Sequence, residues 1–105
     1  MVISGLTVEN ANYEGILVTN SSAITITGNT LTGNNKGLGF ANGMPTCNGL
    51  PSFETNEAFD CGEAIHLQGV HHSTVSNNNV QNNAGGILLS DDTAATHDNL
   101  IAGNL

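Results

Sequence analysis

Basic side chains are almost missing from this sequence of 105 residues. It contains one Lys and no Arg against nine acidic residues, which gives a formal net charge of −8. Such a chain has almost nothing with which to neutralise phosphate groups, so nucleic acid and an anionic membrane surface are excluded as expected partners. A strongly anionic polymer is disfavoured for the same reason, unless a divalent cation bridges the carboxylates. Neutral sugars or metal ions fit this charge better.

Long hydrophobic runs and cysteine are scarce as well. No run is long and apolar enough to predict a transmembrane helix. Cys47 and Cys61 are the only cysteines, and they lack the CxxC spacing of a zinc knuckle or a thioredoxin-type redox pair. The sequence leaves open whether they form a disulfide, because a bridge requires Cα atoms within about 7 Å. The polar, Lys-poor composition is typical of a secreted or cell-surface protein.

Abundant instead are Asn, Gly and Thr, with 16, 13 and 11 copies. This is not a helical composition. An apolar segment recurs at positions 15–18, 37–40, 64–67 and 86–89. A second segment recurs at closely similar spacing, beginning at Asn29, Asn56, Asn78 and Asn99. Each repeat contains short alternating apolar runs separated by Gly, Asn and Ser, which predict short strands joined by turns.

A parallel β-solenoid satisfies both repeats. We predict a single all-β domain over residues 1–105, with about 4 to 5 coils of roughly 22 residues and a loop insertion at about 42–52. Equivalent residues of successive coils then stack about 4.8 Å apart. The predicted buried columns are Ile16, Leu38, Ile65 and Ile87; Val18, Phe40, Leu67 and Leu89; Ile26, Phe53 and Val75; and Leu31, Ala58, Val80 and Ile101.

The recurring Asn residues have a structural explanation. Asn tolerates left-handed backbone angles, and its amide can hydrogen-bond to the Asn one coil away. We therefore interpret the column of Asn29, Asn56, Asn78 and Asn99 as a structural ladder and not as a ligand site.

The repeats also carry a family resemblance. The segments GILVTNSSAITITGNTLTGNN, GEAIHLQGVHHSTVSNNNVQNN and GGILLSDDTAATHDNLIAGN resemble the repeats of right-handed parallel β-helix proteins, the pectin-lyase-like superfamily. The resemblance covers residues 2–105 except for a loop near 42–52, and residues 62–99 resemble uncharacterised secreted bacterial members. It implies a right-handed parallel β-helix and an association with polysaccharide. It does not imply a reaction, because the Arg or Lys base of the family's lyases and the Gly-His-Gly of its polygalacturonases find no counterpart here.

Polar residues gather at one predicted corner of the coil, beside the 42–52 loop. Strand alternation directs His66 and Gln68 outward, and the turns that follow in two successive coils contain His71 and Asp91. The candidate catalytic residues are His66, His71, Asp91 and Asp92. The candidate substrate-binding residues are Gln68, Ser90 and Glu63.

Structural roles remain open for several of these residues. Asp91 and Asp92 also fit a turn in which their carboxylates accept backbone N–H groups. His66 is the strongest candidate, since an outward imidazole can shuttle protons or stack on a sugar. The repeat places His97 on a different sheet, outside the cluster. Glu14, Lys36 and Glu63 share one column, which we interpret as an ion ladder on three successive coils.

Two functions remain as alternatives. The first is a carbohydrate-associated β-helix module that binds or processes polysaccharide, and the sequence leaves open whether it is an enzyme. The second is a structural or adhesive solenoid segment. No cofactor is expected, although Ca²⁺ could bind Asp91, Asp92 and Glu63. Because solenoids need caps at their ends, we also expect a segment of a longer β-helix, or end-to-end self-association of two chains.

Overall fold

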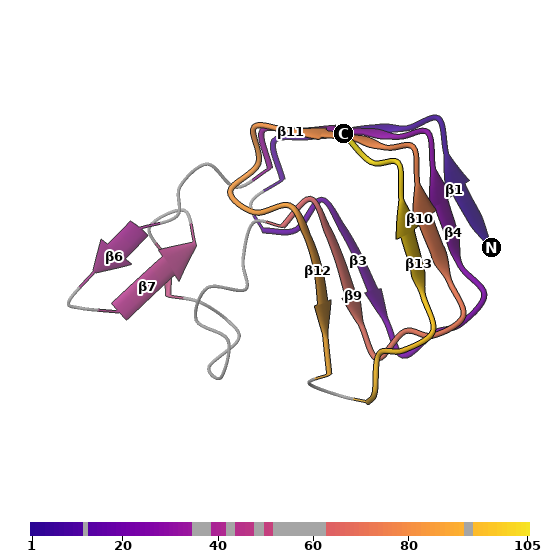
Figure 1. Ribbon diagram of the computed structural model, residues 1–105. Helices are drawn as coiled ribbons and strands as arrows, with labels where there is room; N and C mark the ends of the chain where they lie inside the picture. The colour runs from indigo at the N-terminus through magenta and orange to yellow at the C-terminus, as the bar shows by residue number, and fades with distance from the viewer. Residues whose placement is uncertain (12, 35–38, 42–43, 48–49, 52–62, 92–93) are drawn as a thin grey trace.

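Short strands wound into coils make up the protein in its computed structural model (Figure 1). The structure describes residues 1–11, 13–34, 39–41, 44–47, 50–51, 63–91 and 94–105. No helix in these ranges is long and apolar enough to cross a membrane. The strands of the coils are β1 (Val2–Ser4), β2 (Thr7–Glu9), β3 (Ile16–Thr19), β4 (Thr25–Thr27), β5 (Thr30–Thr32), β9 (Ile65–Gln68), β10 (Thr74–Ser76), β11 (Asn79–Gln81), β12 (Ile87–Ser90) and β13 (Leu100–Ala102).

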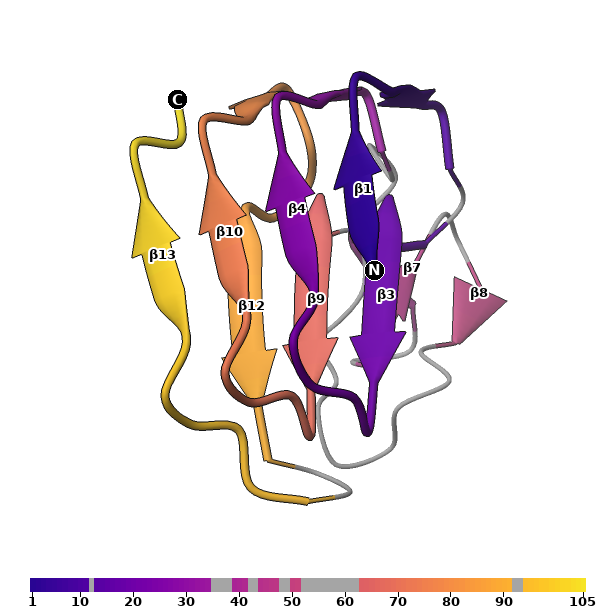
Figure 2. The ribbon, with the colours of Figure 1, turned by 90° about the vertical axis from the view of Figure 1, so that its right-hand side faces the viewer.

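Three parallel sheets run along the solenoid, and each coil contributes one strand to each sheet. Sheet A has the order β1-β4-β10-β13, sheet B the order β2-β5-β11, and sheet C the order β3-β9-β12. Figure 2 shows sheet A in front of sheet C, with their strands side by side in the same order. The described residues therefore form three coils and begin a fourth, and the predicted all-β parallel solenoid is confirmed.

Inward-facing apolar side chains of the three sheets form the core. Ile65 pairs with Ile16 on one side and Ile87 on the other, and Leu67 pairs with Val18 and Leu89 in the same way. Ile26 and Val75 are partners in sheet A, as are Leu31 and Val80 in sheet B. Among the residues whose burial the structure describes, the fully buried apolar ones lie in the middle coils; they are Ile26, Leu31, Ala64, Ile65, Leu67, Val70 and Val75.

The coil predicted around residues 37–61 is wrong. Ile16 pairs directly with Ile65, so no strand lies between these two residues, and Val18 is likewise the direct partner of Leu67. Phe40 belongs instead to β6 (Gly39–Ala41), which pairs antiparallel with β7 (Met44–Cys47). The other residues assigned to that coil lie outside the described residues; they are Leu38, Phe53, Asn56 and Ala58.

Strands β6, β7 and β8 (Leu50–Pro51) form a separate antiparallel sheet, which contains much of the predicted 42–52 insertion. This sheet lies on the outer side of sheet C (Figures 1 and 2). The register shows how far the chain departs from the coil. Ile26 pairs with Ile3 of the preceding coil and with Val75 of the following coil. The chain between Ile26 and Val75 is therefore much longer than the chain between Ile3 and Ile26. The chain thus leaves the solenoid after β5 and rejoins it before β9.

The last corner is also longer than the repeat indicated. Gln68 and Ser90 are partners, and so are His71 and His97, so the later coil uses four more residues between these two positions. This shift moves Ile101 into sheet A beside Val75, and not into the column of Leu31 and Val80. The expectation that His97 lies on a different sheet, outside the cluster, is wrong for the same reason, because His97 pairs with His71.

Buried asparagines hold the corners in register. Asn78 Oδ1 accepts hydrogen bonds from the backbone N–H and the side-chain amide of Asn29, both at 3.0 Å. Asn104 Oδ1 repeats this arrangement on Asn78, at 3.1 and 2.9 Å. The ladder is therefore Asn29, Asn78 and Asn104. Asn99 lies at a different corner, where its Oδ1 accepts the N–H of Ser73.

The left-handed backbone falls one residue before each ladder asparagine and not on it. Gly28, Asn77 and Gly103 have φ of 66°, 56° and 64°. These residues turn the chain, and the next residue sends its amide into the buried corner. A second ladder follows the same rule, because Gly33 and Asn82, with φ of 68° and 58°, precede Asn34 and Asn83. Asn83 Oδ1 accepts the backbone and side-chain N–H groups of Asn34 at 3.0 and 2.8 Å.

We expect Asn78→Ala to destabilise the protein by at least about 2 kcal/mol, because it leaves buried donors of Asn29 and the carbonyl of Ile26 without their partner. The matched control is Asn79→Ala, at an exposed position of β11. Urea unfolding of both variants measures the difference. Equal free energies of unfolding would contradict the structural importance of the ladder.

Candidate functional site

Three imidazoles and one carboxylate meet at the exposed corner between sheets C and A. The corner forms because His71 makes parallel bridges to Ser22 in the preceding coil and to His97 in the following one. His72 and Asp98 come next in their coils, and both have a left-handed backbone, with φ of 53° and 54°. We call His71, His72, His97 and Asp98 the imidazole corner.

The rings of the imidazole corner are stacked and crossed. His71 and His97 lie parallel, with ring centroids 5.1 Å apart and an angle of 2° between their planes. His72 stands edge-on to both rings, at 5.1 and 5.8 Å. The Nδ1 atoms of His71 and His72 are 2.8 Å apart, so one of them donates a hydrogen bond to the other. The coil register therefore builds a small exposed aromatic surface from sequence-distant residues.

Asp98 ties this surface together. His97 Nδ1 donates to Asp98 Oδ2 at 2.7 Å, and His72 Nε2 lies 4.0 Å from the same oxygen. The hydrogen bond from His97, with the positive charge of that imidazole, lowers the pKa of the Asp98 carboxyl. The side chains of His72, His97 and Asp98 are 65%, 49% and 66% exposed, so a ligand can reach them.

Asp91 lies in the longer turn that leads to this corner. Its Oδ1 accepts the backbone N–H of Thr96 at 2.8 Å, which is the turn-capping role that the sequence left open. The Thr96 hydroxyl donates to the carbonyl of Ser90 and accepts the N–H of Gly69. Asp92 lies outside the described residues.

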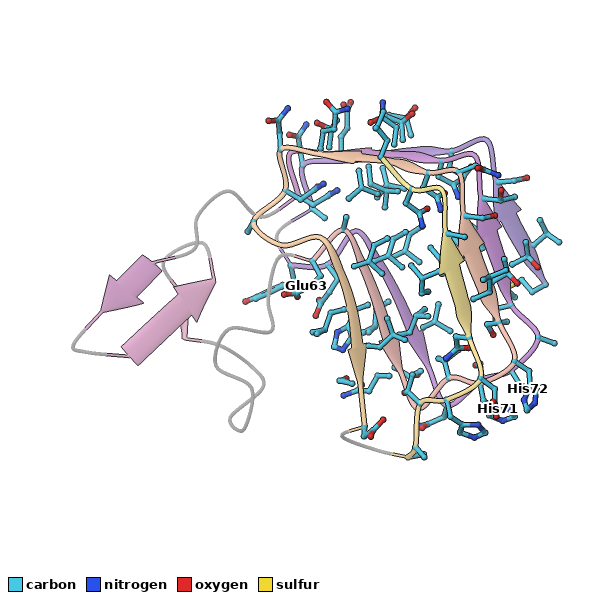
Figure 3. The ribbon with its side chains drawn as sticks, viewed as in Figure 1. Glu63, His71 and His72 are labelled. Carbon is cyan, nitrogen blue, oxygen red and sulfur yellow. The ribbon has the colours of Figure 1, made fainter. Side chains whose placement is uncertain are left out.

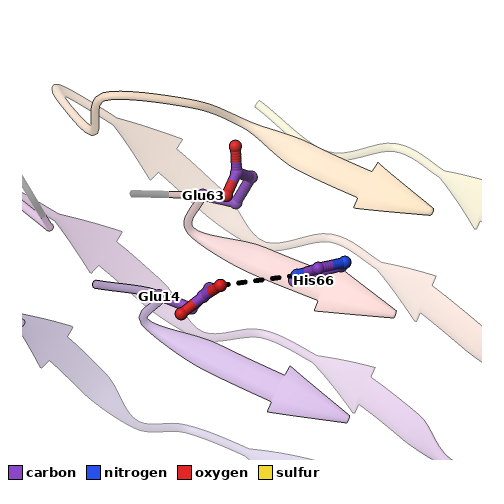
Figure 4. A group of neighbouring side chains, drawn as sticks. All are labelled: Glu14, Glu63 and His66. Carbon is purple, nitrogen blue, oxygen red and sulfur yellow. Dashed lines mark hydrogen bonds and ion pairs between the residues drawn. The ribbon is translucent and has the colours of Figure 1, made fainter. Parts of the chain in front are cut away.

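His66, the strongest sequence candidate, is not on an open surface. It lies on the outer face of β9, as the alternation predicts, but it is completely buried. Its Nε2 lies 2.7 Å from Ser90 Oγ, and its Nδ1 lies 3.5 Å from Glu14 Oε1 (Figure 4). The expectation of an exposed proton shuttle at this position is wrong, because strand alternation predicts the direction of a side chain and not what covers it.

The predicted substrate-binding residues are buried as well. Glu63, Gln68 and Ser90 are 7%, 6% and 9% exposed. Figure 3 shows Glu63 at the opposite end of sheet C from His71 and His72. The predicted cluster thus divides into a buried group around His66 and the exposed imidazole corner.

The candidates predicted from the sequence do not include His72, His97, Asp98 or Glu14. His97 was placed on another sheet because the repeat was aligned on Asn99 and not on Asn104. Glu14 was assigned to an ion ladder with Lys36, which lies outside the described residues. In the structure Glu14 and Glu63 belong to directly adjacent coils, since Gly15 N–H donates to the carbonyl of Glu63 at 3.0 Å. The segment Asp-Asp-Thr-Ala-Ala-Thr at 91–96 contains no large apolar residue, and this was the signal for a longer turn.

Three parallel sheets stacked coil upon coil define a β-helix solenoid, a class to which the sequence already pointed. The model of the family "Right handed beta helix region" matches residues 1–105. The chain therefore belongs to the right-handed β-helix family. No curated protein and no solved structure matches it.

The lowered pKa of Asp98 gives a pH prediction. Its contribution to stability is present above the ordinary pKa of an Asp carboxyl and is lost as the pH falls through the lowered folded-state pKa. We expect an NMR titration of the Asp98 carboxyl to give a midpoint below the ordinary value. In His97→Gln the midpoint should rise toward that value, whereas His72→Gln should change it less. An unchanged midpoint in His97→Gln would show that the 2.7 Å hydrogen bond does not persist in solution.

Proposed function

We propose that this protein is a carbohydrate-associated β-helix module and that it binds glycan at the imidazole corner. The observation that carries the proposal is the parallel stack of His71 on His97, exposed at the corner and held in place by the coil register. Flat exposed rings can pack against the apolar faces of sugar rings. A rigid strand scaffold presents them without a large cost in conformational entropy.

Carboxylates beside the rings supply the polar part of such a site. Asp98 lies against two imidazoles, and Asp91 is exposed in the adjoining turn. Both are hydrogen-bond acceptors suited to sugar hydroxyl groups. With a net charge of −8, the protein favours a neutral glycan over a polyanionic one. Binding and not turnover is proposed, because His66, the expected acid or base, is fully buried.

A structural or adhesive solenoid is the second candidate. This function is favoured because many polar residues, those of the asparagine ladders, serve to hold neighbouring coils together. Self-association end to end belongs to this candidate, because Leu89 in the third coil and Ile101 at the start of the fourth are 41% and 38% exposed. For either function, the low content of basic residues fits a secreted or cell-surface protein.

A glycan array, followed by calorimetry with the best neutral polysaccharide, tests the proposal. We expect His97→Ala to weaken binding about tenfold, because one ring of the stack is removed. His72→Asn should also weaken binding, and Asn keeps the left-handed backbone at that position accessible.

The matched control is Gln81→Ala, an exposed change on sheet B, which should leave binding unchanged. Polygalacturonate with and without Ca²⁺ tests whether an anionic polymer binds through a bridging cation. Binding of no glycan by the folded protein, or equal binding by His97→Ala, would reject the imidazole corner as a sugar site. The structural solenoid would then be the better account.

A further inference from the structure

A second group of chemically active side chains lies on the outer face of sheet C, away from the imidazole corner. Glu14 precedes β3, Glu63 precedes β9, and His66 lies within β9. One ligand atom from each of the three residues lies within 4.8 Å of the other two. Figure 4 shows the Glu14 carboxylate directed at the His66 imidazole, with Glu63 beside them.

Burial makes this group electrostatically unusual. The side chains of His66 and Glu14 are 0% and 5% exposed, and Glu63 is 7% exposed. Two carboxylates brought together away from water repel each other, and each loses its hydration. A protonated His66 or a bound cation would offset this cost. Glu63 and His66 also have further interactions, which limits how far either side chain can move.

The orientation of the imidazole favours a cation over a proton. Ser90 Oγ lies 2.7 Å from Nε2, which fixes the ring and leaves Nδ1 directed at Glu14. The distance from Nδ1 to Glu14 Oε1 is 3.5 Å, longer than the 2.7–2.9 Å usual for a charge-assisted hydrogen bond. Two ligands of one tetrahedral Zn²⁺, each about 2.1 Å from the ion, lie about 3.4 Å apart. The separation of His66 Nδ1 from Glu14 Oε1 therefore resembles that of two ligands of one metal ion. The three ligand atoms together lie within 4.8 Å of one another, so they must draw closer when the ion binds.

The surroundings resemble the supporting shell of a metal centre. A ligating imidazole usually donates its other N–H to a fixed acceptor, and Ser90 Oγ is placed to accept it. Gly85 in the next coil leaves room for the Glu63 carboxylate, because a Cβ there would lie 3.0 Å from Glu63 Oε1.

We propose that Glu14, Glu63 and His66 bind one Zn²⁺ ion through two carboxylate oxygens and His66 Nδ1. One nitrogen and two oxygen ligands with an open fourth position suit Zn²⁺. Ca²⁺ prefers six to eight oxygen ligands, which three side chains cannot supply. The ion joins the first two coils at the point where the chain rejoins the solenoid. This proposal is independent of the glycan site.

Calorimetry of the metal-free full chain with ZnCl₂ tests the proposal. We expect this site to add one equivalent of bound Zn²⁺ and to raise the melting temperature, with little effect from CaCl₂ or MgCl₂. Glu14→Gln and Glu63→Gln keep the side-chain shape and should abolish binding at this site. Ser90→Ala should weaken it about tenfold. Glu9→Gln, a change of the same kind at an exposed position, should have no effect.

The imidazole corner is a possible competitor for zinc, so it needs its own control. His72→Gln/His97→Gln should keep one equivalent of bound Zn²⁺. Loss of all zinc binding in this double variant, with retention in Glu14→Gln, would assign the metal to the exposed histidines and overturn the proposal. Failure of the folded wild-type protein to bind Zn²⁺ would overturn it as well.

Imidazole ¹⁵N NMR keeps the test valid if the buried variants do not fold. The protein has four histidines, and on zinc addition to the wild-type chain only His66 should show a metal-bound Nδ1 with a protonated Nε2. If His66 instead titrates as an imidazolium and ignores zinc, the carboxylates are balanced by a proton and the proposed site does not exist.

Discussion

Hydrogen bonds from the buried asparagine amides at the corners set the register on which the rest of the structure depends. Asn78, Asn83 and Asn104 each accept two N–H groups from the asparagine of a neighbouring coil, and each donates back to a carbonyl of that coil. An unpaired amide in a buried corner is costly, so a slip of one residue would break a whole ladder. With the corners fixed, the short strands between them can pair only as observed, although each strand has just three or four residues.

The same register brings chemically similar groups into contact. Residues at equivalent positions stack a few ångströms apart, so His71 meets His97 and Glu14 comes beside Glu63. Stacked imidazoles gain ring contacts, whereas stacked carboxylates repel each other unless something positive lies between them. The solenoid thus produces two different sites from one rule, an exposed aromatic surface and a buried acidic group beside His66.

Much of the core could be predicted because its pattern is local. Gly or Ala followed by alternating apolar residues identifies Ile65 and Leu67 as inward, and their neighbours in sheet C follow from the repeat. The predicted coil containing Phe40 failed because segment 37–40 has the same apolar pattern as a strand of sheet C. Nothing local distinguishes a strand of the solenoid from a strand of the separate antiparallel sheet. The alignment of the last coil failed because Asn99 and Asn104 both lie next to apolar residues at a spacing that fits the repeat. Only the backbone pairing shows which of the two belongs to the ladder.

The sequence by itself determined the parallel solenoid, the length of its regular repeat and the inward apolar columns of the middle coils. These features follow from the periodic sequence pattern, which recurs in every regular coil and does not depend on contacts with distant residues. Tertiary structure alone decided that β3 pairs with β9, that His97 joins His71, and that His66 is covered and not exposed. The physical reason is that the pairing of two strands does not depend on the number of residues that separate them in the chain. Strands β3 and β9, which flank the long departure from the solenoid, pair in the same parallel register as β9 and β12, which are separated by a single regular coil.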